Sequence, residues 1–382
     1  MKKIVFVIES LHHGGAEKSL VTLLDFLDYN SFAVKLLLFR KGGEFEKFVP
    51  KEVSITYINP FEGINKVSLL FLRARFLINK KLNKNKRYHN AQLFWKTFGN
   101  SIRANKITCD TAIAYNQGFA TYYVAEKILA QKKYSWLNTD YIKAGYQASF
   151  DYNKYTQFKK IICVSQENEL AFIKANKLNN KVLPTEIIKD ITDDLDIKNK
   201  CFEKTEFDLK KDEFKILTVG RLAKAKGFEL AIKACKILKD KGIEHKWYVI
   251  GEGSERENLE RIILEENLED TFILLGYKEN PYPYINTCNI YVQTSLFEGL
   301  GLTVIEAAIL QKPIVTTNFP TAPSLITHNE TGLICEMDAN DIAHNILVYI
   351  ENREFKNKII NNLSKLKNDD KEKSLAKFNK LI

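Results

Sequence analysis

The sequence predicts an α/β protein built from two doubly wound parallel sheets, and three observations support this. Short apolar, β-prone runs alternate with segments of helical period in two successive parts of the chain. The runs are apolar throughout, which is typical of parallel strands that helices cover on both faces. Between the two parts, residues 189–213 are rich in Asp, Lys and Asn and poor in apolar residues, so they predict a linker.

The first part, residues 1–188, contains six predicted strands. They are expected at 3–10, 34–39, 55–59, 111–116, 134–138 and 160–165. Helices are expected between them at 16–27 and 121–130. Because strands alternate with helices, this part is expected to form one domain around a parallel sheet.

The second part, residues 214–360, repeats the same scheme. Strands are expected at 214–220, 246–251, 271–276, 290–295, 313–317 and 332–336. Helices are expected at 228–241, 254–268 and 341–351. In the remaining segment, 361–382, Leu375, Phe378 and Ile382 follow one another at helical spacing and predict a C-terminal helix.

The composition indicates a soluble globular protein. Apolar residues make up 45% of the chain and charged residues 27%, which is ordinary for this class. No run approaches the roughly 18 apolar residues of a membrane span, and the first residues lack the features of a signal peptide. The six cysteines are scattered without the spacing of a metal site, so a reduced, cytoplasmic setting is expected.

Positive charge is concentrated in residues 66–106. This segment contains eleven Lys or Arg and no Asp or Glu, and apolar clusters interleave with the charge. The pattern predicts a basic, amphipathic helical pair, which suits an anionic membrane surface. A solvated helix face on a lysine-rich protein explains the same pattern, and both interpretations stay open. No nucleic-acid-binding motif accompanies the charge, so nucleic acid is not an expected partner.

The most informative stretch places two carboxylates, Glu298 and Glu306, eight residues apart around a glycine loop. A predicted strand precedes it and a predicted helix follows, so Glu298 is expected in the loop and Glu306 in the first turns of the helix. Gly299 and Gly301 remove Cβ atoms where a ligand approaches the backbone. Ionised carboxylates only accept hydrogen bonds and therefore suit a ligand rich in hydroxyl groups. An acidic helix N-terminus without a ligand explains the same spacing.

Two cations follow the first strand of the second part. Arg221 and Lys226 are expected in the loop between this strand and the helix that begins at Phe228. Two positive charges near a helix N-terminus suit a diphosphate and stabilise it as a leaving group. A solvated basic loop is the alternative when this motif is taken by itself.

Glycines follow several other predicted strands. Gly251 and Gly253 close one strand of the second part and Gly276 closes the next, on the same rim of the sheet. In the first part, Gly14 and Gly15 follow the first strand and permit close approach to a phosphate. The G-x-G-x-x-G motif of dinucleotide-binding folds is missing at that place, which argues against a nicotinamide cofactor.

Together these motifs resemble the retaining glycosyltransferases of family four, which have the GT-B fold. The resemblance rests on His13-Gly-Gly-Ala-Glu17, Val219-Gly-Arg-Leu222 with Lys226-Gly227, Gly251-Glu-Gly253 and the E-x7-E run at 298–306. It implies two Rossmann-like domains with a cleft between them. Residues 1–188 would bind the acceptor and 214–360 the nucleotide sugar, while 361–382 would return to the first domain.

The resemblance also implies a role for each candidate residue. Arg221 and Lys226 would hold the donor diphosphate with the backbone at Gly14 and Gly15, and Glu306 would accept hydrogen bonds from the ribose. The other donor-binding candidates are Gly251 and Gly253, then Gly276 and Tyr277 near the base, and Glu298, Gly299, Leu300, Gly301 and Leu302 around the transferred sugar. Asn138 stands where such enzymes usually carry a histidine, and this leaves Asp140 as the nearest titratable catalytic candidate.

The implied activity is transfer, with retention, of a hexose or N-acetylhexosamine from a nucleotide-diphosphate sugar, with UDP favoured. The acceptor would be a hydroxyl of a cell-surface glycan or lipid-linked glycan, at the inner face of the cell membrane. Neither a metal nor a cofactor is implied, because the cations act on the diphosphate. A pseudo-glycosyltransferase that activates a partner enzyme and a GT-B epimerase or phosphorylase are the alternatives.

Overall fold

The computed structural model describes residues 1–83, 87–104, 106–177, 182–205 and 213–382. The chain divides into two compact units. The first unit contains residues 1–191 and 370–382, and the second contains residues 192–369. Part of the predicted linker, residues 206–212, lies outside the described residues.

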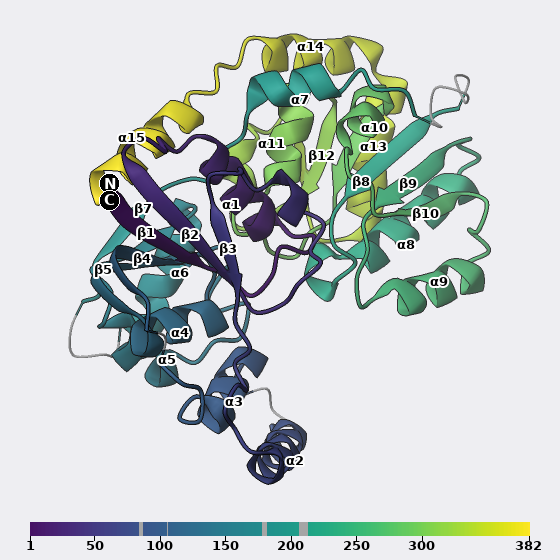
Figure 1. Ribbon diagram of the computed structural model, residues 1–382. Helices are drawn as coiled ribbons and strands as arrows, with labels where there is room; N and C mark the ends of the chain where they lie inside the picture. The colour runs from purple at the N-terminus through teal and green to yellow at the C-terminus, as the bar shows by residue number, and fades with distance from the viewer. Residues whose placement is uncertain (84–86, 105, 178–181, 206–212) are drawn as a thin grey trace. The chain divides into compact units, whose positions relative to one another are not determined.

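The first unit is built on a seven-stranded parallel sheet with the strand order β3-β2-β1-β4-β5-β6-β7 (Figure 1). The strands are β1 (Lys2–Val7), β2 (Phe32–Leu38), β3 (Ser54–Tyr57), β4 (Thr108–Ala114), β5 (Leu129–Leu137), β6 (Lys160–Cys163) and β7 (Thr185–Ile187). The helices that connect them are α1 (Gly15–Asp25), α2 (Lys66–Leu82), α3 (Asn90–Phe98), α4 (Phe119–Lys127), α5 (Ala148–Tyr155) and α6 (Gln166–Asn176).

The second unit is built on a six-stranded parallel sheet with the order β10-β9-β8-β11-β12-β13. The strands are β8 (Lys215–Val219), β9 (Lys246–Ile250), β10 (Phe272–Gly276), β11 (Ile290–Gln293), β12 (Ile314–Thr317) and β13 (Leu333–Cys335). The helices are α7 (Asp194–Lys200), α8 (Phe228–Asp240), α9 (Arg256–Glu265), α10 (Tyr282–Thr287), α11 (Leu302–Ile309), α12 (Ala322–Leu325), α13 (Ala339–Glu351) and α14 (Arg353–Ser364).

Each sheet has a topological switch point, where the chain passes from one side of its first strand to the other. It lies between β1 and β4 in the first unit and between β8 and β11 in the second. The inner strands are largely buried because helices pack on both faces, and the cores include Trp136 in one unit and Trp247 in the other. In sheets of this kind ligands bind outside the carboxyl ends of the strands beside the switch point.

The C-terminal helix α15 (Asp370–Leu381) belongs to the first unit, near the chain's N-terminus (Figure 1). Phe378 is fully buried, and its ring stacks on Phe6 with 6.2 Å between the centroids. The Tyr134 hydroxyl donates a hydrogen bond of 2.7 Å to the carbonyl of Leu381. The segment 361–369, which the sequence grouped with this helix, lies in the second unit because α14 ends there.

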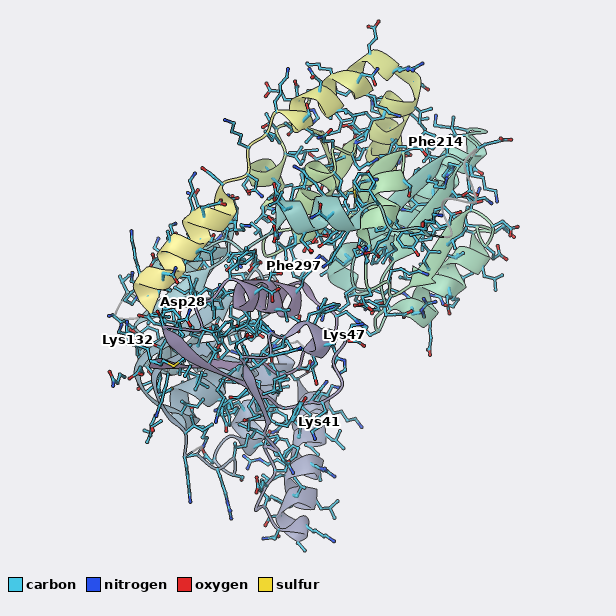
Figure 2. The ribbon with its side chains drawn as sticks, turned by 45° about the horizontal axis from the view of Figure 1, so that its top comes forward. Asp28, Lys41, Lys47, Lys132, Phe214 and Phe297 are labelled. Carbon is cyan, nitrogen blue, oxygen red and sulfur yellow. The ribbon has the colours of Figure 1, made fainter. Side chains whose placement is uncertain are left out.

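The basic segment forms the helices α2 and α3, apart from residues 84–86 and 105, which lie outside the described residues. Leu69, Leu72 and Phe76 on α2 pack toward the aromatic core of the first unit. Figures 1 and 2 show α2 as the outermost element of this unit, beyond α3. Within the described ranges, no helix has both the length and the apolar character that crossing a membrane requires.

Candidate functional site

The carboxyl ends of four neighbouring strands in the second unit, β10, β9, β8 and β11, carry the predicted site residues. Because these strands are parallel and adjacent, the loops that follow them meet along one edge of the sheet. Twelve sequence candidates lie on or next to this edge: Arg221, Lys226, Gly251, Gly253, Gly276, Tyr277, Glu298, Gly299, Leu300, Gly301, Leu302 and Glu306. We call it the β8–β11 edge.

Lys226 and Glu298 form an ion pair at this edge, with 2.6 Å between Nζ and Oε1. The loop with Lys226 is held against the end of β11, because the Thr294 hydroxyl donates to the Lys226 carbonyl at 3.0 Å. Gly227 has a φ of 62°, and a Cβ at this position would lie 2.1 Å from the Thr294 carbonyl oxygen. A side chain at Gly227 would therefore force the loop off the strand and separate the two charges.

The Glu298 carboxylate is held by a network that the sequence did not reveal. Its Oε1 also accepts hydrogen bonds from the Ser295 hydroxyl at 2.6 Å and the Gln293 side-chain amide at 3.1 Å. Gln293 in turn accepts from the Tyr291 hydroxyl at 2.8 Å. Phe297, which precedes Glu298, is labelled in Figure 2. The one signal available in the sequence was the polar Gln293 inside a run otherwise typical of a buried strand.

Glu306 lies within α11 and is buried, with 1% of its surface exposed. The helix begins after Gly301, whose φ of 92° is a left-handed conformation that favours glycine. Burial raises the pKa of the neighbouring Tyr291 phenol, and the negative charges of Glu306 and Glu298 raise it further. The bounds of β11 and α11 place Glu298 in the loop and Glu306 in the helix, as the sequence predicted.

The glycines at 251 and 253 have a packing role in this structure. A Cβ at Gly251 would lie 2.0 Å from the Gly220 carbonyl oxygen, and one at Gly253 would lie 2.2 Å from that of Leu222. The loop after β9 thus lies directly against the loop after β8. This contact alone requires both glycines, so their spacing is not by itself evidence of a ligand.

The remaining candidates of the second unit border the same edge. Arg221 is exposed directly after Gly220, and no ion pair involves it within the described part of the chain. Gly276 has a φ of 74° at the end of β10. Its missing Cβ would lie 3.1 Å from the Glu252 carboxylate, which binds Arg256. Tyr277 follows and is partly buried.

In the first unit, Gly14 and Gly15 begin α1 after β1. The preceding histidines are both oriented toward Glu44, whose Oε2 lies 3.2 Å from the Nδ1 of His12 and 3.0 Å from that of His13. Burial opposes ionisation of Glu44, but its own amide and the two histidines outweigh burial and lower its pKa. Glu44 is distant in sequence and carried no motif, so the sequence did not identify it.

Asn138 and Asp140 follow β5 and have defined local contacts. The Asn138 amide donates to the Tyr115 carbonyl at 2.7 Å, while its buried Oδ1 has no hydrogen-bond partner among the residues described. Asp140 Oδ1 accepts from the amides of Ile142 and Lys143, both at 2.9 Å. Asn138 thus contributes to the packing at the end of β5 through its amide group, and Asp140 stabilises a turn.

No group of three or more His, Cys, Asp or Glu side chains that could hold a metal ion occurs in residues 1–83, 87–104, 106–177, 182–205 and 213–382. The six cysteines are all buried and free. Their burial raises the pKa of the thiols, as at Cys235 and Cys288, to about 12.

Residues 199–366, which lie in the second unit, match the family model described as Glycosyl transferases group 1. A glycosyltransferase of Methanocaldococcus jannaschii, described as uncharacterized, is 30% identical over 191 residues, and the match covers 49% of this chain and 47% of that protein. The N-acetylgalactosamine-N,N'-diacetylbacillosaminyl-diphospho-undecaprenol 4-alpha-N-acetylgalactosaminyltransferase of Campylobacter jejuni is 29% identical, covering 88% of this chain and 87% of that enzyme.

Among solved structures, Anabaena HepE in complex with UDP and glucose is similar to this chain with a TM-score of 0.69. The sequence identity is 17%, and the match covers 100% of this chain and 98% of HepE. At this identity the likeness concerns the fold. The predicted fold class, two α/β units with parallel sheets of the GT-B type, is confirmed.

Proposed function

We propose that this protein transfers a hexose or N-acetylhexosamine from a nucleotide-diphosphate sugar, with UDP favoured, to a hydroxyl of a glycan or lipid-linked glycan. The observation that carries the proposal is the β8–β11 edge, where Lys226 pairs with Glu298 next to the exposed Arg221. The group 1 family match over residues 199–366 supports it, as does the Campylobacter relative, whose name describes a diphospho-undecaprenol acceptor.

Lys226 and Arg221 would bind the donor diphosphate. In transfer with retention, the acceptor oxygen forms its bond to the anomeric carbon on the face from which the diphosphate departs. The bond between that carbon and the diphosphate oxygen breaks, and the acceptor hydroxyl gives its proton to the departing phosphate. The two cations stabilise the negative charge that develops on the leaving group, so the step needs neither a metal nor a cofactor.

Donor binding would rearrange the Lys226–Glu298 pair. Both side chains are largely buried, with 20% of Lys226 and 10% of Glu298 exposed, so either charge needs a compensating partner once the pair separates. A diphosphate carries more charge than one carboxylate and would draw Lys226 toward it. Glu298, still held by Ser295 and Gln293, would then accept hydrogen bonds from hydroxyls of the transferred sugar.

A nucleotide screen tests the proposal. A ligand that binds only the folded state increases the free energy of unfolding, by about 2.7 kcal/mol at a concentration 100 times its Kd. The melting temperature rises as a result. We expect UDP and its sugars to raise the melting temperature of the protein more than GDP or ADP and their sugars. If none of the three nucleotides shifts it, the donor assignment is wrong.

Asn138 motivates a second candidate function, a pseudo-glycosyltransferase that binds a donor and activates a partner enzyme. An amide does not gain or lose a proton near neutral pH, so Asn138 cannot replace a catalytic histidine in acid–base work. A measurement of nucleotide release with acceptor extracts separates the two functions. An active transferase releases free nucleotide from the bound sugar nucleotide, whereas a pseudo-glycosyltransferase releases none with any extract. An epimerase or phosphorylase has no specific support at the β8–β11 edge.

We further propose that α2 binds an anionic membrane surface, which would place a cytoplasmic enzyme at the inner face of the cell membrane beside a lipid-linked acceptor. Six large apolar side chains of α2 are between 58% and 80% exposed: Val67, Leu70, Phe71, Leu77, Ile78 and Leu82. They recur at helical spacing along a helix with basic and no acidic residues. A solvated helix face does not expose a continuous apolar stripe, so this observation favours the membrane over the solvated alternative.

Liposome flotation tests the membrane proposal. We expect the protein to float with liposomes that contain phosphatidylglycerol, and the double variant Phe71→Ser with Leu77→Ser to lose most of that binding. Each apolar side chain that no longer enters the lipid lowers the favourable free energy of membrane binding by about 1.5–3 kcal/mol. The matched control is Leu170→Ser with Leu264→Ser, two exposed leucines on α6 and α9. Equal recovery with neutral and anionic liposomes, or equal loss in the control, would contradict the proposal.

A further inference from the structure

The first unit carries a carboxyl group at its switch point to which the proposed mechanism gives no role. Glu9 follows the end of β1, two residues beyond Val7, which is paired with Ala114 of β4. Ligands of doubly wound sheets bind at this place, outside the carboxyl ends of the strands that flank the switch point. The Glu9 residue is partly exposed, whereas its carboxyl group is buried.

The backbone holds Glu9 in a fixed position. Its carbonyl accepts hydrogen bonds from the amides of Phe39 and Arg40, at 3.0 and 3.1 Å, which join it to the end of β2. The backbone of Ala120, in the first turn of α4, acts to lower the pKa of the Glu9 carboxyl. This helix begins at Gly118, whose φ of 90° is a left-handed conformation. The backbone at the end of β1 is thus fixed against the end of β2.

A pair of stacked rings borders the same place. The Tyr146 hydroxyl would lie 2.8 Å from a Cβ at Gly118, so the ring packs directly against the start of α4. Tyr146 stacks on His89 with 4.1 Å between ring centroids. Burial raises the pKa of the Tyr146 phenol, and the negative charge of Glu9 raises it further.

The charged groups around Glu9 do not neutralise it. No cation lies within ion-pair distance of Glu9 in the described part of the chain. Burial raises the pKa of the Glu9 carboxyl to about 7, and the Glu17 carboxylate of α1 adds to the rise. Hydrogen bonds from the backbone and the positive charge of Arg40 act against it. Folding therefore places a weakly stabilised carboxylate at a ligand-binding edge, a common feature of functional sites.

We propose that Glu9 binds the carbohydrate acceptor by accepting hydrogen bonds from its hydroxyl groups; this rests on the proposed function, which supplies the identity of the ligand. An ionised carboxylate accepts hydrogen bonds and donates none, so it matches hydroxyl groups. Glu9 and Glu17 together would repel a phosphate. A bound hydroxyl favours the ionised form of Glu9, and the acceptor therefore binds more weakly when the carboxyl is protonated.

Binding of simple sugars tests this inference. The probes are methyl glycosides of hexoses and N-acetylhexosamines, titrated into wild-type protein, Glu9→Gln and the control Glu62→Gln, an exposed carboxyl of the same unit. With a pKa near 7, about a tenth of Glu9 is ionised at pH 6, so wild-type affinity should fall roughly tenfold from pH 8 to pH 6. Glu9→Gln should bind about tenfold more weakly at pH 8 and show no pH dependence.

Two further readouts keep the test decisive. UDP titrated in parallel should bind all three proteins with equal affinity. If none of them binds UDP, the result contradicts the proposed function rather than the role of Glu9. Glu9→Gln should also melt at a higher temperature than wild type at pH 8. The pKa of Glu9 is higher in the folded than in the unfolded protein, so ionisation of Glu9 above the unfolded pKa destabilises the folded wild type. The difference in melting temperature between the two proteins should therefore disappear toward pH 4.5. Equal glycoside affinity in wild type and Glu9→Gln, or no glycoside binding by wild type, overturns the inference.

Discussion

Replacing Lys226 by alanine should lower the turnover number by about 10²–10³-fold, and donor affinity by a smaller factor of roughly tenfold. The reason is that Lys226 interacts more strongly with the negative charge that develops on the leaving diphosphate in the transition state than with the bound donor. Arg221→Ala should have a similar effect. The measurement is the initial rate of nucleotide release from the UDP-sugar that gives the largest thermal shift, with a membrane extract as the acceptor.

Lys224→Ala is the matched control for this experiment. Lys224 lies in the same short turn as Lys226 and is exposed, so the variant removes one positive charge from the loop without disturbing Glu298. It should keep turnover within about twofold of wild type. If Lys226→Ala and Arg221→Ala turn over as fast as Lys224→Ala, the leaving-group assignment is wrong.

Glu306→Ala should weaken UDP binding by about 1.5–3 kcal/mol, which corresponds to roughly ten- to hundredfold in Kd. Glu306 would accept hydrogen bonds from the ribose hydroxyls, and bonds to a charged acceptor are the stronger ones. The loss should appear in binding itself, because ribose contacts do not change when the sugar is transferred. Isothermal titration of UDP into the variant measures it.

Glu269→Ala is the control for the Glu306 variant. Glu269 is an exposed carboxylate of the same unit that precedes β10, at the amino end of the strand, so its removal changes the net charge equally without touching the β8–β11 edge. UDP affinity should be unchanged in this control. An unchanged Kd in a folded Glu306→Ala protein, checked by circular dichroism, would remove Glu306 from the donor site.

Much of the fold follows from the sequence because the spacing of apolar residues distinguishes buried strands from helices. The twelve predicted strands all occur, since each is a short β-prone run rich in apolar residues. β7 was missed because it has three residues of intermediate burial and hence no apolar run. α7 was missed because the segment 189–213 has few apolar residues; one of them, Ile197, is enough to anchor the helix.

The candidate site was predictable only where local chemistry specifies it. Glycines beside strand ends and charges in their loops are visible as motifs, so Lys226 and Glu298 were identified. Their pairing joins residues 72 positions apart and depends on how β8 and β11 pack. Gln293, Glu44 and Glu9 escaped notice for the same reason, because their significance comes from contacts between strand ends.

The most direct test of the β8–β11 edge as a diphosphate site compares UDP with uridine by isothermal titration into the wild-type protein. Uridine retains the base and ribose but lacks the diphosphate that Lys226 and Arg221 would bind. Two charge-assisted contacts of about 1.5–3 kcal/mol each predict that UDP binds at least about a hundredfold more tightly than uridine. Equal affinities, or no binding of UDP, would contradict a diphosphate site at this edge.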